Sequence, residues 1–469
     1  MERNLAKTKF YELQNVTIED FSSEGKGIVK NDGKVIFVEG GVAGDVVSIQ
    51  VKKNHKSFET GKILKMISPS DKRQEPYCKH YNQCGGCKTQ HITYPNQLKW
   101  KQDVVKNAIE RIGGFTDLNI LSILGCEHTE YYRNKLDYAV SNKRWLSFEE
   151  INSEKTFNRN GIGFHLAGMF DKVLDVHECF HMPVLNNTIR NFIRDTAFEL
   201  EVSFYDIVAK TGCLRNILVR NNVKNEWMIC FQVYDLDDNF LTLLEKIKNQ
   251  FPQIISLQYT NNRKANDTVY DQEFHVFHGQ DFIYEYLKEK KFRITPKSFF
   301  QTNTEQCIRL YDLVGEIADI KEGQVVYDLY CGVGSIGIYL ADKAKKVVGI
   351  ELVEEAIVDA RMNAKINGME NCDYHAADIK DIFKSEFIAK AGAPDVIITD
   401  PPRAGMHPDV VHELSQSGCQ KIVYVSCNPQ TMANDLKALA INYHIKRIQP
   451  VDMFPHTIHI ECIALLEKK

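Results

Sequence analysis

The fold of this chain is decided by the stretch DLYCGVGSIG at residues 328–337, which follows a strand-like run and precedes a helix-like segment. Its glycines let the backbone approach a bound ligand closely, at the edge of a sheet. Glu351 ends the next strand-like run, 19 residues after Gly332, where a carboxylate can accept hydrogen bonds from both hydroxyls of a ribose. This spacing predicts a nucleotide-type cofactor, and it suits a nicotinamide dinucleotide as well as S-adenosylmethionine.

Helix-like and strand-like segments alternate on both sides of this stretch. The helix-like segments lie at about 304–318 and 354–367, and the strand-like runs lie at 325–329, 346–351, 396–400 and 422–425. Regular alternation of this length is typical of a doubly wound parallel sheet. We therefore predict an α/β, Rossmann-like C-terminal domain over residues 294–469.

The rest of the chain falls into two further parts. Short β-rich runs separated by Asn-Asp-Gly and Gly-Gly turns fill residues 1–66, and they predict a small barrel of the OB-like kind. Strand-like and helical segments mix without a clear period over 67–293, which we assign to a mixed α+β central domain. That part includes a helix at about 94–112, for which the C-terminal domain is a candidate packing partner.

Composition restricts the class and the location of the protein. The chain has 469 residues, of which 43% are hydrophobic and 26% are charged, as expected of a globular protein with two or three domains. No apolar run approaches the ~18 residues of a membrane span, and residues 1–10 lack the apolar core of a signal peptide. We therefore expect a cytoplasmic protein without membrane association. The formal net charge of −4 leaves nucleic-acid binding open, because binding needs only a local basic face.

A second informative stretch is Val425-Ser426-Cys427-Asn428-Pro429. It holds a cysteine in a loop at a strand end, where a thiolate can meet a substrate. Asp400-Pro401-Pro402-Arg403 lies upstream and Glu461 lies downstream. A thiol nucleophile, a loop stiffened by two prolines and a late carboxylate together predict covalent chemistry on a nucleobase. Asp328 and Asp400 favour S-adenosylmethionine as the cofactor, because its sulfonium end is cationic.

Three of the 13 cysteines lie close together, at Cys78, Cys84 and Cys87. In a cytoplasmic protein such a group indicates metal binding or catalysis rather than disulfides. Four thiolates can hold either Zn²⁺ or a [4Fe–4S] cluster. The spacing of five and then two residues is unlike paired zinc knuckles and favours iron, with the fourth ligand about 90 residues further along the chain.

By these residues the chain resembles the RNA uracil-5-methyltransferases over nearly its whole length. The N-terminal part resembles a TRAM domain at Glu24-Gly25-Lys26-Gly27 and Gly41-Val42-Ala43-Gly44-Asp45. The C-terminal part shares the motifs of the family at 300–301, 328–337, 400–403, 426–429 and 459–461. The cysteines, completed by Cys179, resemble the branch that carries a [4Fe–4S] cluster and acts mostly on 23S rRNA. Members specific for tRNA usually lack both the barrel and these cysteines.

The resemblance implies two cofactors, S-adenosylmethionine and a [4Fe–4S] cluster, and ribosomal 23S RNA as the partner, with no obligate protein partner. It makes Cys427 the nucleophile that adds to C6 of uracil, and Glu461 the base that removes the C5 proton after methyl transfer. The residues it implies around S-adenosylmethionine are Gln301, Tyr330, Glu351 and Asp400, with Asp378 near the adenine. The cluster ligands it implies are Cys78, Cys84, Cys87 and Cys179. Arg133-Asn134-Lys135 resembles the RNA-facing segment of the family.

Three other hypotheses stay open at this point. The same reaction on tRNA needs the same residues. An adenine amino-methyltransferase usually has an Asn-Pro-Pro-aromatic loop and needs no nucleophilic cysteine, whereas this chain has Asp400 and Arg403 at the corresponding positions. A non-enzymatic RNA-binding or redox-sensing iron–sulfur protein has no use for Cys427 and Glu461.

Overall fold

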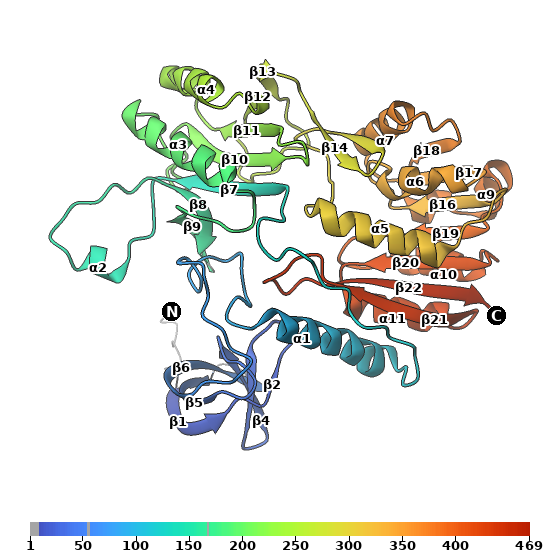
Figure 1. Ribbon diagram of the computed structural model, residues 1–469, viewed down its shortest axis with the longest axis horizontal. Helices are drawn as coiled ribbons and strands as arrows, with labels where there is room; N and C mark the ends of the chain where they lie inside the picture. The colour runs from blue at the N-terminus through green and yellow to red at the C-terminus, as the bar shows by residue number, and fades with distance from the viewer. Residues whose placement is uncertain (1–8, 54–56, 167) are drawn as a thin grey trace, which may run out of the picture.

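The computed structural model describes residues 9–53, 57–166 and 168–469. An N-terminal six-stranded sheet, a central seven-stranded sheet and a C-terminal seven-stranded sheet follow one another along the chain. The first lies below the second in Figure 1, and the third stands beside both. No helix in the described part of the chain combines the length and apolarity needed to cross a bilayer.

The N-terminal sheet curls around a small core and has the strand order β1-β5-β6-β4-β3-β2. Its strands are β1 (Lys9–Thr17), β2 (Asp20–Phe21), β3 (Gly27–Asn31), β4 (Lys34–Glu39), β5 (Val46–Lys53) and β6 (Phe58–Ser68). Alternate residues face the core: Val47, Ile49 and Val51 of β5 are fully buried. This period of two is the pattern of a half-buried strand.

The central sheet has the order β13-β12-β11-β10-β7-β8-β9. Its strands are β7 (Lys135–Ser141), β8 (Gly161–Leu166), β9 (Met169–Asp175), β10 (Leu214–Asn221), β11 (Trp227–Val233), β12 (Ile254–Asn261) and β13 (His275–Gly279). Its helices are α2 (Phe148–Ile151), α3 (Leu185–Glu199) and α4 (Asp238–Gln250). On β11, Ile229 packs with α3 and α4, while the next residue, Cys230, packs with the C-terminal domain. Because β11 is buried on both faces, it has no polar–apolar alternation, which is why no clear period is found in this part of the sequence.

The C-terminal sheet has the order β18-β17-β16-β19-β20-β22-β21. Its strands are β16 (Val325–Leu329), β17 (Lys346–Glu351), β18 (Cys372–Ala376), β19 (Val396–Thr399), β20 (Lys421–Ser426), β21 (Tyr443–Val451) and β22 (Glu461–Lys468), preceded by the hairpin β14 (Ile283–Leu287) and β15 (Lys290–Ile294). The first five strands of the sheet are parallel, and β22 and β21 are antiparallel. The predicted doubly wound sheet is confirmed.

Helices cover both faces of the C-terminal sheet. They are α5 (Thr304–Ala318), α6 (Ser335–Leu340) with the short turn η2 (Ala341–Lys343), α7 (Glu354–Ile366), α8 (Ile379–Ile382), α9 (Ser385–Ala391), α10 (Pro408–Gln416) and α11 (Pro429–Leu439). Leu310, Ile336 and Ile357 bring α5, α6 and α7 to one hydrophobic core. Val410 and Met432 bring α10 and α11 to the core on the opposite face.

Helix α1 (Tyr94–Asn107), continued by the π-helix η1 (Ala108–Gly113), lies between the barrel and the C-terminal domain. Val105 and Ile109 are buried in the same core as α11. On the other side, the indole nitrogen of Trp100 donates to the carbonyl of Ser22, 2.9 Å away, and its ring packs near Phe21. Helix α1 thus joins two parts that are far apart in the sequence.

One buried ion pair fixes α1 to the C-terminal domain. Lys101 Nζ lies 2.7 Å from Asp452 Oδ1, and both side chains are fully buried. Tyr94 also donates to Asp452, through its hydroxyl to Oδ2 at 2.9 Å. Removing the cation would leave a buried carboxylate without its counter-charge, which is far more costly than the loss of an exposed pair.

We expect Lys101→Met to destabilise the protein by about 3–5 kcal/mol. The matched control is Lys99→Met on the exposed side of the same helix, which should change stability by less than about 0.5 kcal/mol. Urea unfolding followed by tryptophan fluorescence measures both, since Trp100 lies in this interface. Equal stability of the two variants would contradict a structural role for the buried pair.

Candidate active site

The candidate site lies where the parallel strands of the C-terminal sheet end. Tyr330 follows β16, Glu351 ends β17, Asp400 follows β19 and Cys427 follows β20. The carboxyl ends of parallel strands meet at one edge of the sheet, and ligands bind there. Glu461 reaches the same edge from the opposite direction, because β22 runs antiparallel to β20 and its second residue pairs with Ser426.

The glycine loop between β16 and α6 is held by Asp328. The Oδ2 atom of this carboxylate accepts from the amide of Gly337 at 2.8 Å, while Oδ1 is buried without a hydrogen-bond partner among the described residues. Gly334 has φ +77°, and a Cβ added to it would lie 2.6 Å from the Tyr374 hydroxyl. Tyr330 also adopts a positive φ of 61°. The loop thus packs closely against its neighbours, and one buried oxygen of Asp328 is left without a partner among the described residues.

Glu351 is oriented by two backbone amides. Its Oε2 accepts from Gly332 at 3.2 Å and its Oε1 accepts from Val353 at 3.0 Å. Each carboxylate oxygen keeps lone-pair capacity, which suits the two hydroxyls of a ribose. Asp378, after β18, caps α8 and pairs with Lys380 at 2.9 Å. Burial raises the pKa of Tyr330 to about 12, and the negative charge of Asp378 adds to this effect.

Three carboxyl groups share this edge of the sheet, and their pKa values are raised. Burial raises the pKa of Asp328 to about 7 and that of Asp400 to about 6. Burial raises the pKa of Glu461 well above its ordinary value, Asp400 adds to the effect, and Arg403 opposes it. A nearby positive charge stabilises the ionised form of each of these carboxyl groups. The site therefore favours a cationic ligand.

Cys427 is half-buried beside these groups. Burial, then Glu461 and Asp400, raise the pKa of its thiol to about 11, while Arg403 lowers it. The next residue, Asn428, donates from Nδ2 to the carbonyl of Arg403 at 3.1 Å and caps α11 through its side chain. The cysteine loop and the Asp-Pro-Pro-Arg loop are therefore joined.

The other predicted cofactor residue, Gln301, lies in the segment that enters α5. Its carbonyl accepts from Asn134 Nδ2 at 3.0 Å. Asn134 also donates to Glu285 and Thr304 and is buried, and the guanidinium of Arg133 lies 5.2 Å from the Phe454 ring centroid. Arg133 and Asn134, predicted to face RNA, thus make contacts between segments inside the protein.

The four predicted metal ligands line one cavity of about 100 Å³, together with His181 and Gln90. The amide of Gly86 donates to Cys84 Sγ at 3.4 Å, and Gln90 Nε2 donates to Cys87 Sγ at 3.3 Å. Within residues 9–53, 57–166 and 168–469, however, no three His, Cys, Asp or Glu side chains are arranged to hold a single metal ion. The structure therefore brings the cysteines together but does not confirm the predicted metal centre.

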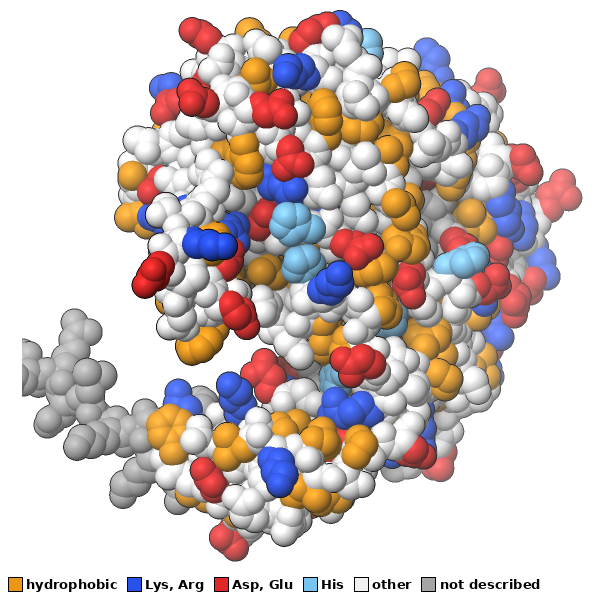
Figure 2. Space-filling view, turned by 60° about the vertical axis from the view of Figure 1, so that its left-hand side comes forward, with side chains coloured by type: hydrophobic (Ala, Val, Ile, Leu, Met, Phe, Trp, Pro, Cys, Tyr) orange, Lys and Arg blue, Asp and Glu red, His pale blue; other side chains and the backbone are white. Residues whose placement is uncertain are grey.

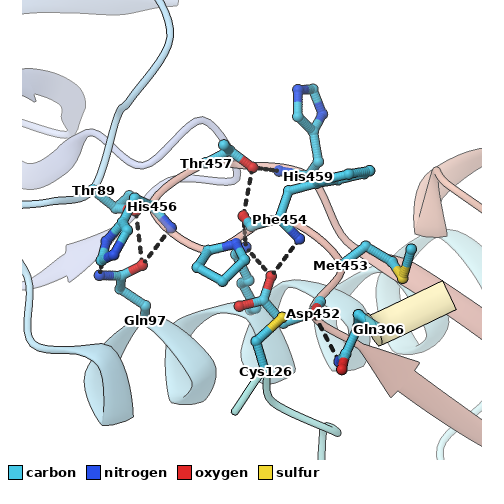
Figure 3. Close-up of polar contacts among 12 residues, drawn as sticks. Thr89, Gln97, Cys126, Gln306, Asp452, Met453, Phe454, His456, Thr457 and His459 are labelled. Atoms are coloured by element: carbon cyan, nitrogen blue, oxygen red, sulfur yellow. Dashed lines mark hydrogen bonds and ion pairs between the residues drawn. The ribbon is translucent and has the colours of Figure 1, made fainter. Parts of the chain in front are cut away.

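Sequence reasoning identified the motif at 459–461 but missed residues 452–458, the part of the loop that leads to it. Figure 3 shows residues 452–459 in a network of buried polar contacts, with the ring of His459 directed away from it. The amide of His459 donates to Thr457 Oγ1 at 3.3 Å. Burial, then Arg403 and Arg133, lower the pKa of His459 to about 4, so its imidazole is neutral near pH 7. In the sequence, His459 belongs to the motif at 459–461, whereas no local pattern marks residues 452–458.

A hollow in the surface lies between the barrel and the central sheet (Figure 2). Lys and Arg side chains are visible on the barrel below the hollow, and acidic side chains are visible above it. A surface hollowed between two domains can receive a large substrate, and basic side chains at its border attract phosphate groups.

Two family models match the chain. The model of the TRAM domain matches residues 11–64, and the model described as tRNA (Uracil-5-)-methyltransferase matches residues 224–469. An uncharacterized RNA methyltransferase of Bacteroides thetaiotaomicron is 44% identical over 451 residues, which cover 95% of this chain and 99% of the relative. Another, from Porphyromonas gingivalis, is 43% identical over 459 residues, which cover 96% of this chain and 98% of the relative.

The structure is also similar to a solved one. The Pyrococcus abyssi tRNA (uracil-54, C5)-methyltransferase, solved in complex with S-adenosyl-L-homocysteine, matches with a TM-score of 0.75 and 29% identity. The match covers 97% of this chain and 100% of the other. The predicted TRAM domain and Rossmann-like methyltransferase domain are confirmed. The chain therefore belongs to the tRNA (uracil-5-)-methyltransferase family, as an S-adenosylmethionine-dependent RNA methyltransferase with an N-terminal TRAM domain.

Proposed function

We propose that this protein methylates C5 of a specific uridine in 23S rRNA through a covalent bond between Cys427 and C6 of the base. The observation that carries the mechanism is the placement of a thiol and a buried carboxyl group side by side. Cys427 directly follows Ser426, and Glu461 directly precedes Cys462, the residue that pairs with Ser426 across β20 and β22. The electrostatic effect of Glu461 on Cys427 supports the same proximity.

The reaction needs both groups because C5 of uracil is a weak carbon nucleophile. Cys427 adds to C6 as the thiolate, the form that the nearby Arg403 favours, and the electrons of the C5–C6 double bond move toward O4 to form an enolate. When bound, S-adenosylmethionine would supply the methyl group to C5, and its sulfur would keep the electrons of the broken sulfur–methyl bond. The carboxylate of Glu461 then takes the C5 proton, the electrons of the C5–H bond re-form the double bond, and the sulfur leaves as a thiolate.

We also propose roles for the cofactor residues at the same edge of the sheet. We assign the ribose to Glu351, the adenine end to Asp378 and Tyr330, and the sulfonium end to Asp400 and Gln301. The unpaired Oδ1 of Asp328 is available to the cofactor ammonium group. The target base has to leave its stack to reach Cys427, at a cost of a few kcal/mol, and we assign the holding of the unfolded RNA to the TRAM and central domains.

The choice between rRNA and tRNA is a separate matter. The TRAM domain and the cysteines favour 23S rRNA, because tRNA-specific members usually lack both. The Pyrococcus abyssi enzyme weakens this argument, since it is named for uracil-54 of tRNA and matches this chain over its whole length. Methylation of tRNA is therefore the second candidate function, with the same residues and the same chemistry.

We expect Cys427→Ala to lower methyl transfer by at least about 1,000-fold, because the nucleophile is lost. With RNA that contains 5-fluorouridine, C5 carries fluorine in place of the proton that Glu461 removes, so the wild-type adduct persists and resists denaturant. Gel electrophoresis should show this adduct in the wild type and none in Cys427→Ala. Cys372→Ala, a half-buried cysteine at the start of β18, is the matched control. An adduct in Cys427→Ala would contradict the assignment.

We also propose that Cys78, Cys84, Cys87 and Cys179 hold a [4Fe–4S] cluster with a structural or RNA-facing role, since methyl transfer involves no net electron flow. The shared cavity and the two hydrogen bonds to cysteine sulfur support it, because such bonds are typical around iron–sulfur clusters. We expect close to four iron and four sulfide per protein prepared without air, with loss of both in Cys87→Ser. Zinc without sulfide would overturn the proposal.

A further inference from the structure

The loop between β21 and β22 leads directly into Glu461, and its backbone is held along most of its length (Figure 3). Each carbonyl from residue 452 to residue 456 accepts a hydrogen bond from outside the loop. The donors are Gln306 and Cys126 to Asp452, Asn303 to Met453, Lys101 to Phe454, Tyr132 to Pro455, and the amides of Lys88 and Thr89 to His456. Several of these donors lie more than 300 residues away in the sequence.

Gln97 of α1 makes the most complete set of these contacts. Its Oε1 accepts from the amide of His456 at 3.0 Å and from the hydroxyl of Thr89 at 3.1 Å. Its Nε2 donates to the carbonyl of Ile92 at 2.7 Å and lies 3.1 Å from His456 Nδ1. The side chain is fully buried, and its two donors and both acceptor lone pairs are used.

The turn that Gln97 holds has an uncommon conformation. His456 has φ +63°, in the left-handed region that a non-glycine residue keeps only when its surroundings hold it there. Glu461 lies five residues further along, so the direction of the chain at His456 affects where the carboxylate points.

The same turn is bound to the cysteine segment. Lys88 and Thr89, whose amides lie 2.8 and 3.2 Å from the carbonyl of His456, directly follow Cys87 in the chain. The ring of Tyr77, just before Cys78, lies edge-on to the ring of His456 at 5.6 Å. The wall of the cysteine cavity and the turn before the proposed base are thus in direct contact.

We propose that Gln97 is a positioning residue for Glu461: by holding the His456 turn, it sets the carboxylate where the C5 proton has to be removed. The inference rests on the proposed function. It concerns one step, in which the proton passes from C5 to the Glu461 carboxylate, the C–H electrons re-form the C5–C6 double bond, and the Cys427 sulfur leaves with the electrons of the C6–S bond. Attack by Cys427 and methyl transfer precede this step and do not depend on Gln97.

The test uses Gln97→Leu, which keeps the volume of the side chain but removes its hydrogen bonds. Gln102→Leu on the same helix is the matched control, because Gln102 Nε2 donates to the carbonyl of Leu121 rather than to the loop. Steady-state rates with ordinary uridine RNA, the amount of methyl-labelled protein–RNA adduct that survives denaturant, and the rate of adduct formation with 5-fluorouridine RNA are measured for each. Glu461→Gln serves as the reference for loss of the base.

We expect Gln97→Leu to lower kcat by about 10- to 100-fold, since a small misplacement of a reacting group has effects of this size, with KM within about twofold of wild type. The methyl-labelled adduct should accumulate with ordinary uridine RNA, as in Glu461→Gln, while the 5-fluorouridine adduct should form at the wild-type rate. Thr89→Val, which removes one donor to Gln97, should lower kcat and accumulate the methyl-labelled adduct to a smaller extent. This variant tests the inference if Gln97→Leu does not fold.

A lower kcat without adduct accumulation, or an equal loss of the 5-fluorouridine adduct, would overturn the inference, because either result indicates a general structural defect. If Glu461→Gln accumulates adduct and Gln97→Leu and Thr89→Val do not, the proposed function stands and the role of Gln97 fails. If Glu461→Gln accumulates no adduct, the assigned base is wrong, and both fail together.

Discussion

The buried contact between Lys101 and Asp452 is the interaction on which the arrangement of the molecule depends. Lys101 belongs to helix α1, which also binds the barrel through Trp100, and Asp452 begins the loop that ends at Glu461. Helix α1 is therefore held to the methyltransferase domain by a charged pair with no exposure to solvent, and to the TRAM domain by Trp100. Because neither charge can be hydrated once buried, the pair forms only when these parts are in place. The loop that leads to the proposed base is thus held by a contact that also holds α1 on the methyltransferase domain.

The electrostatics of the site are consistent with the chemistry we propose for it. Burial raises the pKa values of Asp328, Asp400 and Glu461, and Asp400 adds to the effect on the other two. A positive charge bound among them favours their ionised forms, and an ionised Glu461 is the form that accepts a proton. Arg403 acts in the same direction on Glu461 and Cys427. The binding of a cationic cofactor and the activation of the base are therefore linked through one group of carboxylates.

Much of the fold could be predicted from the sequence where local patterns are strong. The predicted helix at 304–318 is α5, and the predicted strands at 325–329 and 346–351 are β16 and β17, because apolar runs bounded by glycine or polar turns have a distinct period. Strand β18 was missed, since Cys372–Ala376 is short and contains Asp373 and His375. The central sheet was missed because strands such as β11 are buried on both faces. Gln97 and Asn134 were not recognised as internal residues. The partner of Gln97 lies 359 residues away and that of Asn134 lies 167 residues away, and contacts over such separations leave no local pattern in the sequence.

The activity proposed for this family member is methylation of C5 of uridine in 23S rRNA. The most direct test is incubation of the purified protein, prepared without air, with labelled S-adenosylmethionine and unmodified 23S rRNA and tRNA. Nuclease digestion and mass spectrometry then identify the labelled nucleoside and its position. We expect 5-methyluridine within 23S rRNA and no label in tRNA. Label on any base other than uracil would contradict the chemistry, and 5-methyluridine in tRNA alone would contradict the substrate.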